Sequence, residues 1–362
     1  MADRRAERLD GLRSSLEAAK LDGLLLTSLP NIRYITGFTG SSALVAVTQH
    51  EVLFITDFRY DTQVHAEVGD FARIDVEAQS LWDGLWRLLA EMRPAEMLGF
   101  ESAHLVHRDF ERLLSAGSRW QWRATSDMVE ALRERKDPGE LSLIAEAAEV
   151  ASRALERAVK AVRVGMTELA IAGALEQALR DEGSEGFPFE TIVASGPRAA
   201  LPHARPGSRH LERGDFLLID FGAIVRGYCS DVTRTFVAGK ADAEQREVFE
   251  IVRGANEVAA TEVRAGMSGR DADALARRYI EDRGHGGEFG HSLGHGIGLE
   301  VHEAPRLART AGAPLPEHAV VTIEPGIYRP GWGGVRIEDD VVLDPEGPRT
   351  LTRLPRELIE IG

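Results

Sequence analysis

Residues 215–236 read DFLLIDFGAIVRGYCSDVTRTF, and residues 319–342 read AVVTIEPGIYRPGWGGVRIEDDVV. Each stretch places two acidic residues in apolar, strand-like surroundings: Asp220 and Asp231 in the first, Glu324 and Glu338 in the second. Burying a carboxylate costs several kcal/mol unless it is paired or bound to a metal. Four of them in one domain need cations, and a pair of divalent metal ions would supply about the right charge.

The two stretches belong to a faint internal repeat. Asp220 aligns with Glu324 at a spacing of 104 residues, and Asp231 aligns with Glu338 at a spacing of 107. Because side chains alternate between the two faces of a strand, the acidic groups of one strand pair can face the same side. We expect a duplicated half-domain whose equivalent strand pairs are related by a pseudo-twofold axis.

A helical segment precedes each acidic stretch. Residues 163–183 resemble residues 264–284, and their shared glycine repeats after 101 residues. Thr167 in the first segment and Ser268 in the second can cap a helix that ends at a glycine. The similar spacing of helices and acidic residues favours a real duplication over chance similarity.

His295, in SLGHGIG, adds an imidazole to this acidic set. It stands between Gly294 and Gly296, where the backbone must bend closely around something, and we expect it to be a metal ligand. An oxygen-rich set with one imidazole suits Mn, Co, Fe or Zn, and it is too acidic for one structural zinc.

Two metal ions about 3.5–4 Å apart, bridged by carboxylates and a water, would turn that water into a nucleophile near neutral pH. The predicted reaction is therefore hydrolysis of an acyl or phosphoryl bond. An acyl bond is favoured, because the chain has no glycine-rich phosphate loop followed by a lysine.

Three further histidines and one arginine are candidates for the surroundings of the metals. His203 in LPHARP and His302 in LEVHEAP repeat after 99 residues and could stabilise an oxyanion or shuttle a proton. His291, four residues before His295, could hold the substrate. Arg336, two residues before Glu338, could orient a metal-ligating carboxylate through a two-point contact. The alternative for Arg336 is a structural ion pair elsewhere.

Composition limits the class of protein. The chain has 362 residues, of which 43% are hydrophobic and 28% charged, as is typical of a globular protein. A formal net charge of −15 argues against nucleic acid or an anionic membrane as a partner. The single cysteine fits a reducing compartment, and no apolar run is long enough for a signal peptide or a membrane span. We expect a cytoplasmic protein.

Helix and strand signals alternate in the N-terminal part and predict an α/β layer domain over residues 1–125, followed by a second domain over residues 126–362. A helix-rich stretch at the boundary should stop and restart at residues 137–139, Asp-Pro-Gly. Elements expected in the first domain are helices at residues 3–20, 31–38 and 80–92 and strands at residues 23–28, 43–48, 52–57 and 97–102.

These motifs resemble, in order and spacing, the pita-bread metallopeptidases, and the bacterial Xaa-Pro peptidases in particular: aminopeptidase P and the Xaa-Pro dipeptidases (prolidases). The motifs that carry the resemblance are LPHARP, LLIDFGAIVRGYCSDVTRT, FGHSLGHGIGLEVHEAP, VVTIEPGIY and GGVRIEDDVVL. More weakly, NIRYITGFTGSSA and FITDFRYDTQ are similar to the creatinase/prolidase-type N-terminal domain. The resemblance covers nearly the whole chain.

The resemblance implies a role for each candidate residue. Asp220 would bind one metal, His295 and Glu324 the other, and Asp231 and Glu338 would bridge both. Glu324 would also handle the proton of the bridging hydroxide. The three histidines at positions 203, 291 and 302 match those that bind substrate or steady the tetrahedral intermediate. It further implies two divalent ions, with Mn expected and Co, Zn or Fe possible, proline-containing peptides as substrates, and a homodimer.

Several alternatives stay open on the sequence. A methionine aminopeptidase resembles the catalytic part but usually lacks the N-terminal domain. A prolidase would accept only dipeptides, because a wall closes the site beyond proline. Candidates for that wall are Tyr34, Phe38, Arg59 and Tyr60, although these are at least as compatible with core or surface roles. A protein that reuses the fold for binding alone should have lost metal ligands, and none is lost here.

Overall fold

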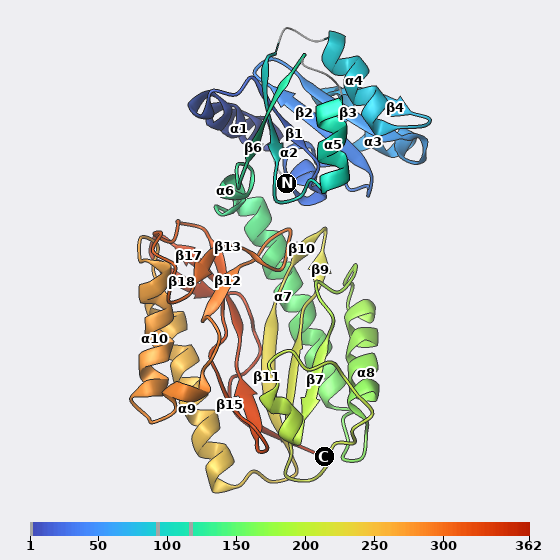
Figure 1. The fold of residues 1–362 in the computed structure, drawn as a ribbon. Coiled ribbons are helices and arrows are strands. Elements are labelled where there is room, and N and C mark those ends of the chain that lie inside the picture. The colour runs from blue at the N-terminus through green and yellow to red at the C-terminus, as the bar shows by residue number, and fades with distance from the viewer. Residues whose placement is uncertain (1–2, 92–94, 116–118) are drawn as a thin grey trace. The chain divides into compact units, whose positions relative to one another are not determined.

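A computed structural model describes residues 3–91, 95–115 and 119–362 of the chain (Figure 1). The chain divides into two compact units, Met1–Arg133 and Glu134–Gly362. The sequence-based boundary near residue 125 lies earlier than this division. The short helix α6 (Glu130–Arg133) goes with the first unit, since Arg133 donates a hydrogen bond of 2.6 Å to Oδ1 of the buried Asn31.

The first unit is built on one six-stranded sheet with the order β4-β3-β2-β1-β5-β6. The central strands β1, β2 and β3 pair antiparallel, while β4, β5 and β6 are added in parallel. Its strands are β1 (Gly23–Leu26), β2 (Ala43–Thr48), β3 (Val52–Asp57), β4 (Arg73–Glu77), β5 (Met97–Glu101) and β6 (Gln121–Thr125). Its other helices are α1 (Arg5–Ala19), α2 (Leu29–Thr36), η1 (Phe58–Tyr60), α3 (Asp61–Glu67), η2 (Gly69–Phe71), α4 (Leu81–Glu91) and α5 (His107–Ser115).

The sequence predicted most of these elements, with two informative differences. Strand β1 ends at Leu26 rather than at Ser28, because the N–H groups of Thr27 and Ser28 donate to the buried carboxylate of Glu101 instead. Helix α2 begins before the predicted Asn31, with a proline in its first turn, where the missing N–H costs nothing. Met92, the expected end of the third helix, lies outside the described residues.

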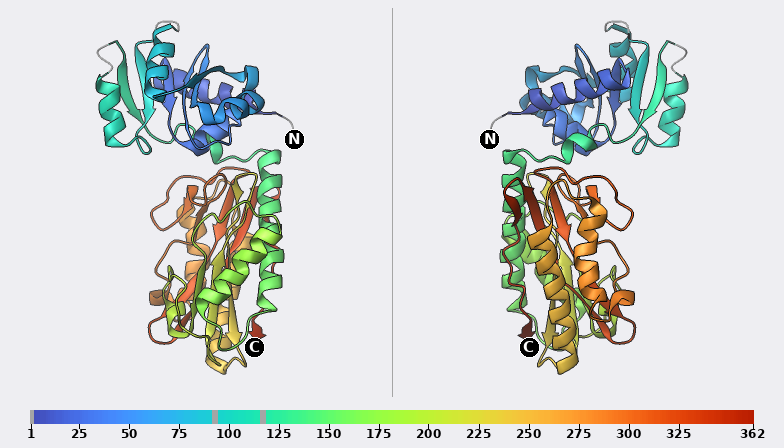
Figure 2. Two further views of the ribbon diagram at one scale, coloured as in Figure 1. Left: turned by 90° about the vertical axis from the view of Figure 1, so that its right-hand side faces the viewer. Right: turned by 90° about the vertical axis from the view of Figure 1, so that its left-hand side faces the viewer.

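The second unit contains two similar halves. The first half consists of α7 (Pro138–Val159), α8 (Glu168–Asp181), β7 (Ile192–Ser195), η3 (Gly196–Ala200), β8 (Phe216–Phe221), β9 (Ile224–Val225), β10 (Tyr228–Cys229) and β11 (Val232–Ala238). As predicted, α7 starts at the Asp-Pro-Gly stretch, where Asp137 and Glu140 form a capping box. Figure 2 shows α7 running alongside the strands of this unit.

The second half repeats the order of helices and strands. It consists of α9 (Ala243–Glu262), α10 (Gly269–Glu281), η4 (Gly286–Glu288), β12 (Gly294–Gly296), β13 (Glu303–Leu307), β14 (Val320–Ile323), β15 (Gly326–Arg329), β16 (Gly333–Arg336), β17 (Asp339–Asp344), β18 (Gly347–Thr350) and β19 (Ile359–Ile361). The larger sheets of the unit have the orders β19-β11-β8-β7 and β13-β12-β14-β17-β18, and β10-β9 and β15-β16 form two-stranded ribbons.

The repeat extends to single hydrogen bonds. Thr167 caps α8 and Ser268 caps α10, each accepting from the backbone N–H three residues later at 3.1 Å. One strand pair of each half, β8–β11 and β14–β17, is antiparallel and carries the acidic residues at its ends. The duplication predicted from the sequence is therefore visible in the capping and in the strand pairing.

The two halves meet along β11 and the chain that leads into β17. The N–H of Glu338 donates to the carbonyl of Thr233 at 3.1 Å, and Arg234 donates to the carbonyl of Glu338 at 2.7 Å. Apolar side chains fill the unit on both sides of this seam, with Phe221 and Phe249 among the fully buried ones.

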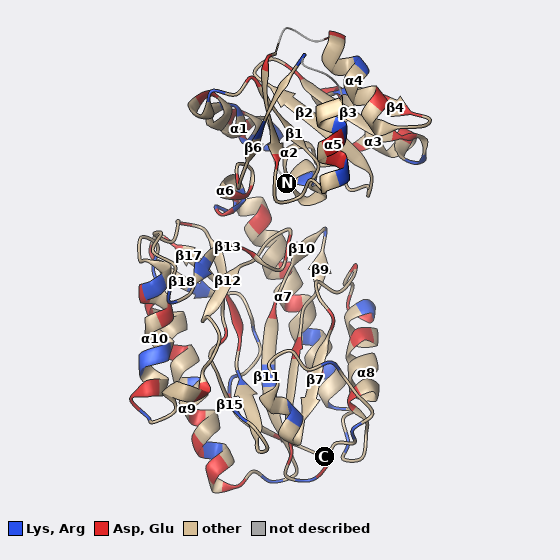
Figure 3. Ribbon diagram, viewed as in Figure 1, with Lys and Arg blue, Asp and Glu red and all other residues tan. Residues whose placement is uncertain are grey.

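Charged residues of the second unit lie mainly on its helices. In the second unit, the strands are mostly uncharged, whereas α8, α9 and α10 carry much of the charge (Figure 3). The buried carboxylates on the strands are thus exceptions to the pattern of this unit. Among the described residues, every helix is too short or too polar to span a lipid bilayer.

Candidate active site

A cavity of about 460 Å³ opens in the second unit. All nine site residues predicted from the sequence line it: His203, Asp220, Asp231, His291, His295, His302, Glu324, Arg336 and Glu338. Residues separated by up to 135 positions in the chain therefore share one cavity. Apolar and basic residues complete its lining, namely Phe189, Ile192, Pro202, Ala204, Arg205 and Arg306, together with Glu190 and Ser292.

The acidic residues reach the cavity from equivalent places in the two halves. Asp220 lies near the end of β8 and Glu324 directly after β14, while Asp231 and Glu338 directly precede β11 and β17. Three of them are buried, and the Glu324 side chain is 17% exposed. Apolar sheet residues surround these positions, which explains why the carboxylates are withdrawn from water.

His295 lies on β12 between two glycines whose small size is required. A Cβ atom at Gly294 would approach the carbonyl oxygen of Thr322 to 1.9 Å, and one at Gly296 would approach the carbonyl oxygen of Ala304 to 2.1 Å. The tight packing of these strands against β12 holds the imidazole in place. The sequence predicted a backbone that bends closely here, and the structure shows neighbouring backbone packed against both glycines and an irregular strand register between His295 and Gly296.

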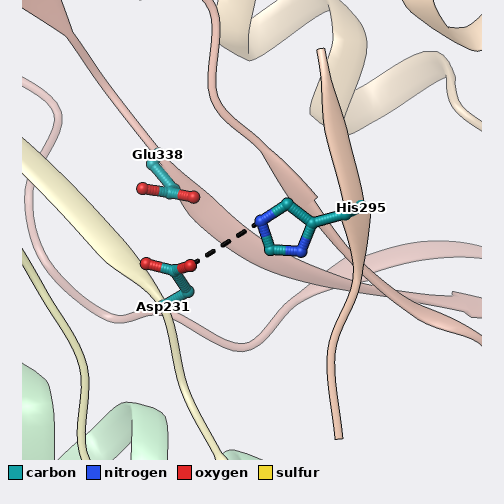
Figure 4. A group of neighbouring side chains, drawn as sticks. All are labelled: Asp231, His295 and Glu338. Atoms are coloured by element: carbon teal, nitrogen blue, oxygen red, sulfur yellow. Dashed lines mark ion pairs between the residues drawn. The ribbon is translucent and has the colours of Figure 1, made fainter. Parts of the chain in front are cut away.

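The imidazole of His295 is oriented for binding a cation. Its Nδ1 lies 3.0 Å from the carbonyl oxygen of Gly296, so Nδ1 carries the hydrogen and Nε2 presents a lone pair. Nε2 lies 3.6 Å from Glu324 Oε1 and 3.8 Å from Asp231 Oδ2. Figure 4 shows the ring pointing toward the carboxylates of Asp231 and Glu338.

Carboxylate oxygens without hydrogen-bond partners indicate whether a metal ion fits these acidic residues and His295. Oδ1 of Asp220 and Oδ1 of Asp231 are buried and have no hydrogen-bond partner among the described residues. Ligand atoms of Asp231, His295 and Glu338 all lie within 4.8 Å of one another. Buried carboxylate oxygens without donors are costly unless a cation binds them. The donor set therefore fits divalent metal ions.

The pKa values in the metal-free site reflect the same crowding of charge. Burial, together with the carboxylates of Glu338 and Asp220, raises the pKa of Asp231 well above its usual range. Burial and the carboxylates of Glu324 and Asp220 likewise raise the pKa of Glu338. Burial raises the pKa of Glu324 to about 8. Without a cation, these groups favour their protonated forms.

Of the four histidines that line the cavity, two are partly or fully buried and uncharged, and two are exposed. Burial lowers the pKa of His291 to about 4, and that of His295 also to about 4, so both rings are uncharged at neutral pH. His302 is exposed at the cavity, and its ring centre lies 4.4 Å from that of His295. His203 is also exposed. These rings can meet a ligand that enters the cavity.

Arg336 contacts the acidic set differently from the predicted two-point pair. Its Nη2 donates to Oδ2 of Asp220 at 2.5 Å, while Oδ1 of Asp220 receives no donor. Its Nε donates to the hydroxyl of Thr233 at 3.0 Å, and that hydroxyl donates to Glu338 Oε2 at 2.6 Å. The guanidinium divides its donors among several partners, so it contacts one carboxylate directly, that of Asp220, and reaches Glu338 only through the Thr233 hydroxyl.

The sequence interpretation missed three residues that support the site. The Tyr328 hydroxyl accepts a hydrogen bond from Arg336 Nη1 at 2.8 Å and lies 2.9 Å from His291 Nε2. Thr233 forms the bridge just described, and the buried Asp340 accepts a hydrogen bond of 3.1 Å from the N–H of Asp231. Strand alternation could have found one of them, because Thr233 stands two residues after Asp231 at the start of β11.

The proposed wall residues lie in the first unit. Tyr34 and Phe38 are buried there, Tyr34 donating to the carbonyl of Leu132 and Phe38 packing edge-on against Phe54. Their side chains thus serve the core of that unit, which was the alternative interpretation. Arg59 is exposed and pairs with Asp57, and Tyr60 is partly exposed.

Comparison with known proteins agrees with this geometry. Residues 142–345 match metallopeptidase family M24, and residues 8–135 match the creatinase/prolidase N-terminal domain. The second match accounts for the N-terminal domain that the methionine aminopeptidase alternative left unexplained. Membership in the first family implies divalent metal ions as cofactors.

Individual relatives match along their whole length. The Xaa-Pro dipeptidase of Pyrococcus horikoshii is 34% identical over 98% of this chain and 99% of its own. A solved structure of an Xaa-Pro dipeptidase from Bacillus anthracis has a TM-score of 0.95 at 40% identity and covers 99% of this chain and 100% of its own. One of an X-Pro aminopeptidase from Thermotoga maritima has a TM-score of 0.89 at 39% identity, covering 98% and 99%. The chain therefore belongs to metallopeptidase family M24 and combines its pita-bread catalytic domain with a creatinase/prolidase-type N-terminal domain.

Proposed function

We propose that the protein hydrolyses the peptide bond between an N-terminal residue and a following proline. The observation that carries this proposal is the cavity, which is lined by five potential metal ligands, one of them His295, and by three further histidines. Asp220 would hold one metal ion, His295 and Glu324 the other, and Asp231 and Glu338 would hold both. When bound, such ions activate water as a nucleophile near neutral pH and polarise the peptide carbonyl.

The side chains around the ligands supply the remaining chemistry. Glu324 faces the cavity beside Asp231 and His295, where its carboxylate would accept a proton from water and pass it to the leaving amine. His203 and His302 are exposed at the cavity, where they can donate hydrogen bonds to the oxygen of a tetrahedral intermediate. His291 would contribute to binding of the substrate, and Arg336 would orient Asp220.

The oxygen-rich donor set favours manganese, with Co, Zn or Fe as alternatives. The similarity to enzymes named for Xaa-Pro bonds supports proline peptides as substrates. The homodimer and the cytoplasmic location predicted from the sequence stay predictions.

A restriction to dipeptides is the second candidate function, and Arg306 favours it. Arg306 lines the cavity, and no acidic side chain among the described residues forms an ion pair with it. A cation at that place could bind the carboxylate of a dipeptide, which in a longer peptide is replaced by an uncharged amide. The two solved structures compared above, a dipeptidase and an aminopeptidase, are almost equally similar in sequence and do not separate the two functions.

A peptide series tests both functions. The full-length protein, with and without added Mn, is given Ala-Pro, Ala-Pro-Ala and Ala-Ala-Ala, and product release is followed. We expect Mn-dependent cleavage of the proline peptides only. Cleavage of Ala-Pro alone would establish a dipeptidase, and cleavage of both would establish an aminopeptidase.

An Asp231→Ala variant serves as the control, since it should lose metal-dependent cleavage altogether. Full activity of a metal-stripped Asp231→Ala sample would contradict the proposal. Absence of bound metal in the wild type, together with no effect of Mn or Co on cleavage, would instead favour a protein that uses the fold for binding alone.

A further inference from the structure

A buried ion pair on α10 holds the loop that carries His291. Asp273 and Arg277 lie one helical turn apart, and their side chains are only 2% and 8% exposed. Arg277 Nε lies 2.6 Å from Asp273 Oδ2, and Nη2 lies 2.8 Å from Oδ1. Such a two-point contact fixes the orientation of both side chains as well as pairing their charges.

The ion pair uses its other hydrogen-bonding atoms on the backbone of residues 289–293. Arg277 donates to the carbonyl oxygen of Phe289 at 2.9 Å and to that of His291 at 2.7 Å. The N–H of Leu293 donates to Asp273 Oδ1 at 3.0 Å. One ion pair therefore binds three backbone groups within five consecutive residues.

Phe289 extends this contact to the imidazole itself. The guanidinium carbon of Arg277 lies 4.1 Å from the centre of the Phe289 ring. That ring meets His291 edge-on, with centres 5.1 Å apart. The ion pair thus limits both the backbone of His291 and one side of its ring.

Leu293 connects the same ion pair to Glu324. Its N–H is bound to Asp273, and its carbonyl accepts a hydrogen bond of 2.9 Å from the N–H of Glu324. Nδ1 of His291 lies 3.9 Å from Glu324 Oε2. A shift of the α10 pair would therefore be passed to two groups that face the cavity.

The internal repeat shows that helix packing alone does not require this ion pair. At the spacing of 101 residues that relates α8 to α10, the equivalents of Asp273 and Arg277 are Ala172 and Glu176. Helix α8 has the same N-terminal capping without such a pair. Burying two charges costs free energy, and a pair of apolar side chains in their place often stabilises a fold at least as well. An ion pair at these two helix positions occurs in the half that carries His291 and His295, whereas on α8 the buried Glu168 pairs with Arg198 of η3.

We propose that Asp273 and Arg277 are positioning residues, which hold His291 and Glu324 in the arrangement that hydrolysis needs. This inference rests on the function proposed above. Misplacement of reacting groups by about 1 Å can lower a rate by about a hundredfold, even when the substitution lies far from the chemistry. Neither side chain lines the cavity of the candidate active site, so neither is expected to touch the substrate.

Arg277→Lys is the first test, because lysine keeps the charge but loses the planar fork that reaches Asp273 and two carbonyls. The matched control is Arg278→Lys, at the exposed next position on α10. Both full-length proteins are loaded with Mn and compared with the wild type in kcat, KM, bound metal and Tm. We expect Arg277→Lys to lower kcat by about tenfold or more at unchanged metal content, with KM changing far less. The control should match the wild type.

A merely structural role would lower Tm and metal content together with kcat. Wild-type kcat in Arg277→Lys, or a loss that follows the loss of metal, would overturn the proposal. If Arg277→Lys does not fold, the double variant Asp273→Leu/Arg277→Met replaces both charges by an apolar pair, which avoids an unpaired buried charge. Wild-type kcat in the folded double variant would equally overturn the proposal.

Failure of the proposed function is distinguishable, because the wild-type protein itself would then not cleave Ala-Pro. In that case, the nitrogen NMR signals of ¹⁵N-labelled histidine in the zinc-loaded protein provide the test. The His291 ring signals should shift in Arg277→Lys and stay unchanged in Arg278→Lys. Unchanged His291 signals in Arg277→Lys would contradict a positioning role.

Discussion

Nη2 of Arg336 lies 2.5 Å from Oδ2 of Asp220, and both side chains are buried. This contact leaves the second oxygen of Asp220 without a donor. The arginine therefore neutralises part of the charge and aims the other oxygen at the cavity. Groups that orient a metal ligand in this way typically change metal affinity or activity by about 10- to 100-fold when replaced.

Replacing Arg336 with Met should remove this orientation while keeping an unbranched side chain. We expect metal affinity or kcat to fall by roughly 10- to 100-fold, because Asp220 and Thr233 each lose the hydrogen bond that Arg336 donates to them. Titration with Mn followed by peptide cleavage measures both quantities. Arg349→Met, at an exposed position of β18, is the control. Equal metal affinity and equal kcat in the two variants would contradict the role given to Arg336.

Replacing Tyr328 with Phe removes only the hydroxyl between Arg336 and His291. We expect kcat to fall and the free energy of unfolding to drop by about 1–3 kcal/mol, since the buried Arg336 Nη1 keeps only a long hydrogen bond of 3.4 Å to the carbonyl of Pro202. Urea unfolding and steady-state kinetics measure the two effects. Tyr279→Phe, on α10, is the matched control, because its ring stacks on Arg283 and no hydrogen bond of its hydroxyl is found among the described residues. A Tyr328→Phe protein as stable and active as the control would count against this network.

The glycine before His295 offers a steric test. A methyl group at Gly294 would meet the carbonyl oxygen of Thr322 at 1.9 Å, so Gly294→Ala should push β12 away from β14. We expect lost metal binding and a destabilisation of about 1–3 kcal/mol or more. Gly290→Ala is the control, because among the described residues only its direct chain neighbours come within 4 Å of the added methyl position. Isothermal titration with Mn should detect binding in the control and none in Gly294→Ala.

The metal-free protein should lose stability as the pH rises from about 6.5 to 8. Burial raises the pKa of Glu324 from 4.5 to about 8, so the folded state binds more protons than the unfolded state in this range, and unfolding becomes easier with rising pH. Below 6.5, the lowered pKa values of His291 and His295 act in the opposite direction. Tm is measured with a chelator and with saturating Mn, and the Mn-loaded protein should lack the decline.

Glu324→Gln should weaken the same decline, since it removes one of the carboxyl groups whose pKa is raised, while Asp231 and Glu338 keep their contributions. A metal-free Tm that stays constant or increases between pH 6.5 and 8 would show that the carboxyls in the folded protein are already ionised without a cation.

The acidic residues and His295 were predictable because their residue types conflict with their surroundings. A carboxylate in an apolar strand or an imidazole between glycines is unexpected on folding grounds alone, and the repeat gave each acidic residue an equivalent. The strands at residues 43–48 and 52–57 were predicted with the bounds that the structure has, because both are short apolar runs ended by turns.

The supporting contacts were not predictable, because they depend on which polar residues become buried. In GRDADALARRYIE, Asp273 and Arg277 look like any surface pair of a polar helix, and the sequence does not distinguish Arg277 from the exposed Arg278. The buried pair of Lys136 and Glu303 joins residues 167 positions apart. No local pattern marks contacts of this kind.

The seam between the two halves has a consequence for assembly. Asp220 and Asp231 come from one half, whereas His295, Glu324 and Glu338 come from the other, so neither half holds a complete ligand set. A cation that binds all of them binds only the docked pair, and its binding free energy adds to the docking. Bound metal would then hold the two halves of the second unit together. A chain cut in the connection between β11 and α9 should stay together in Mn and separate more readily in a chelator.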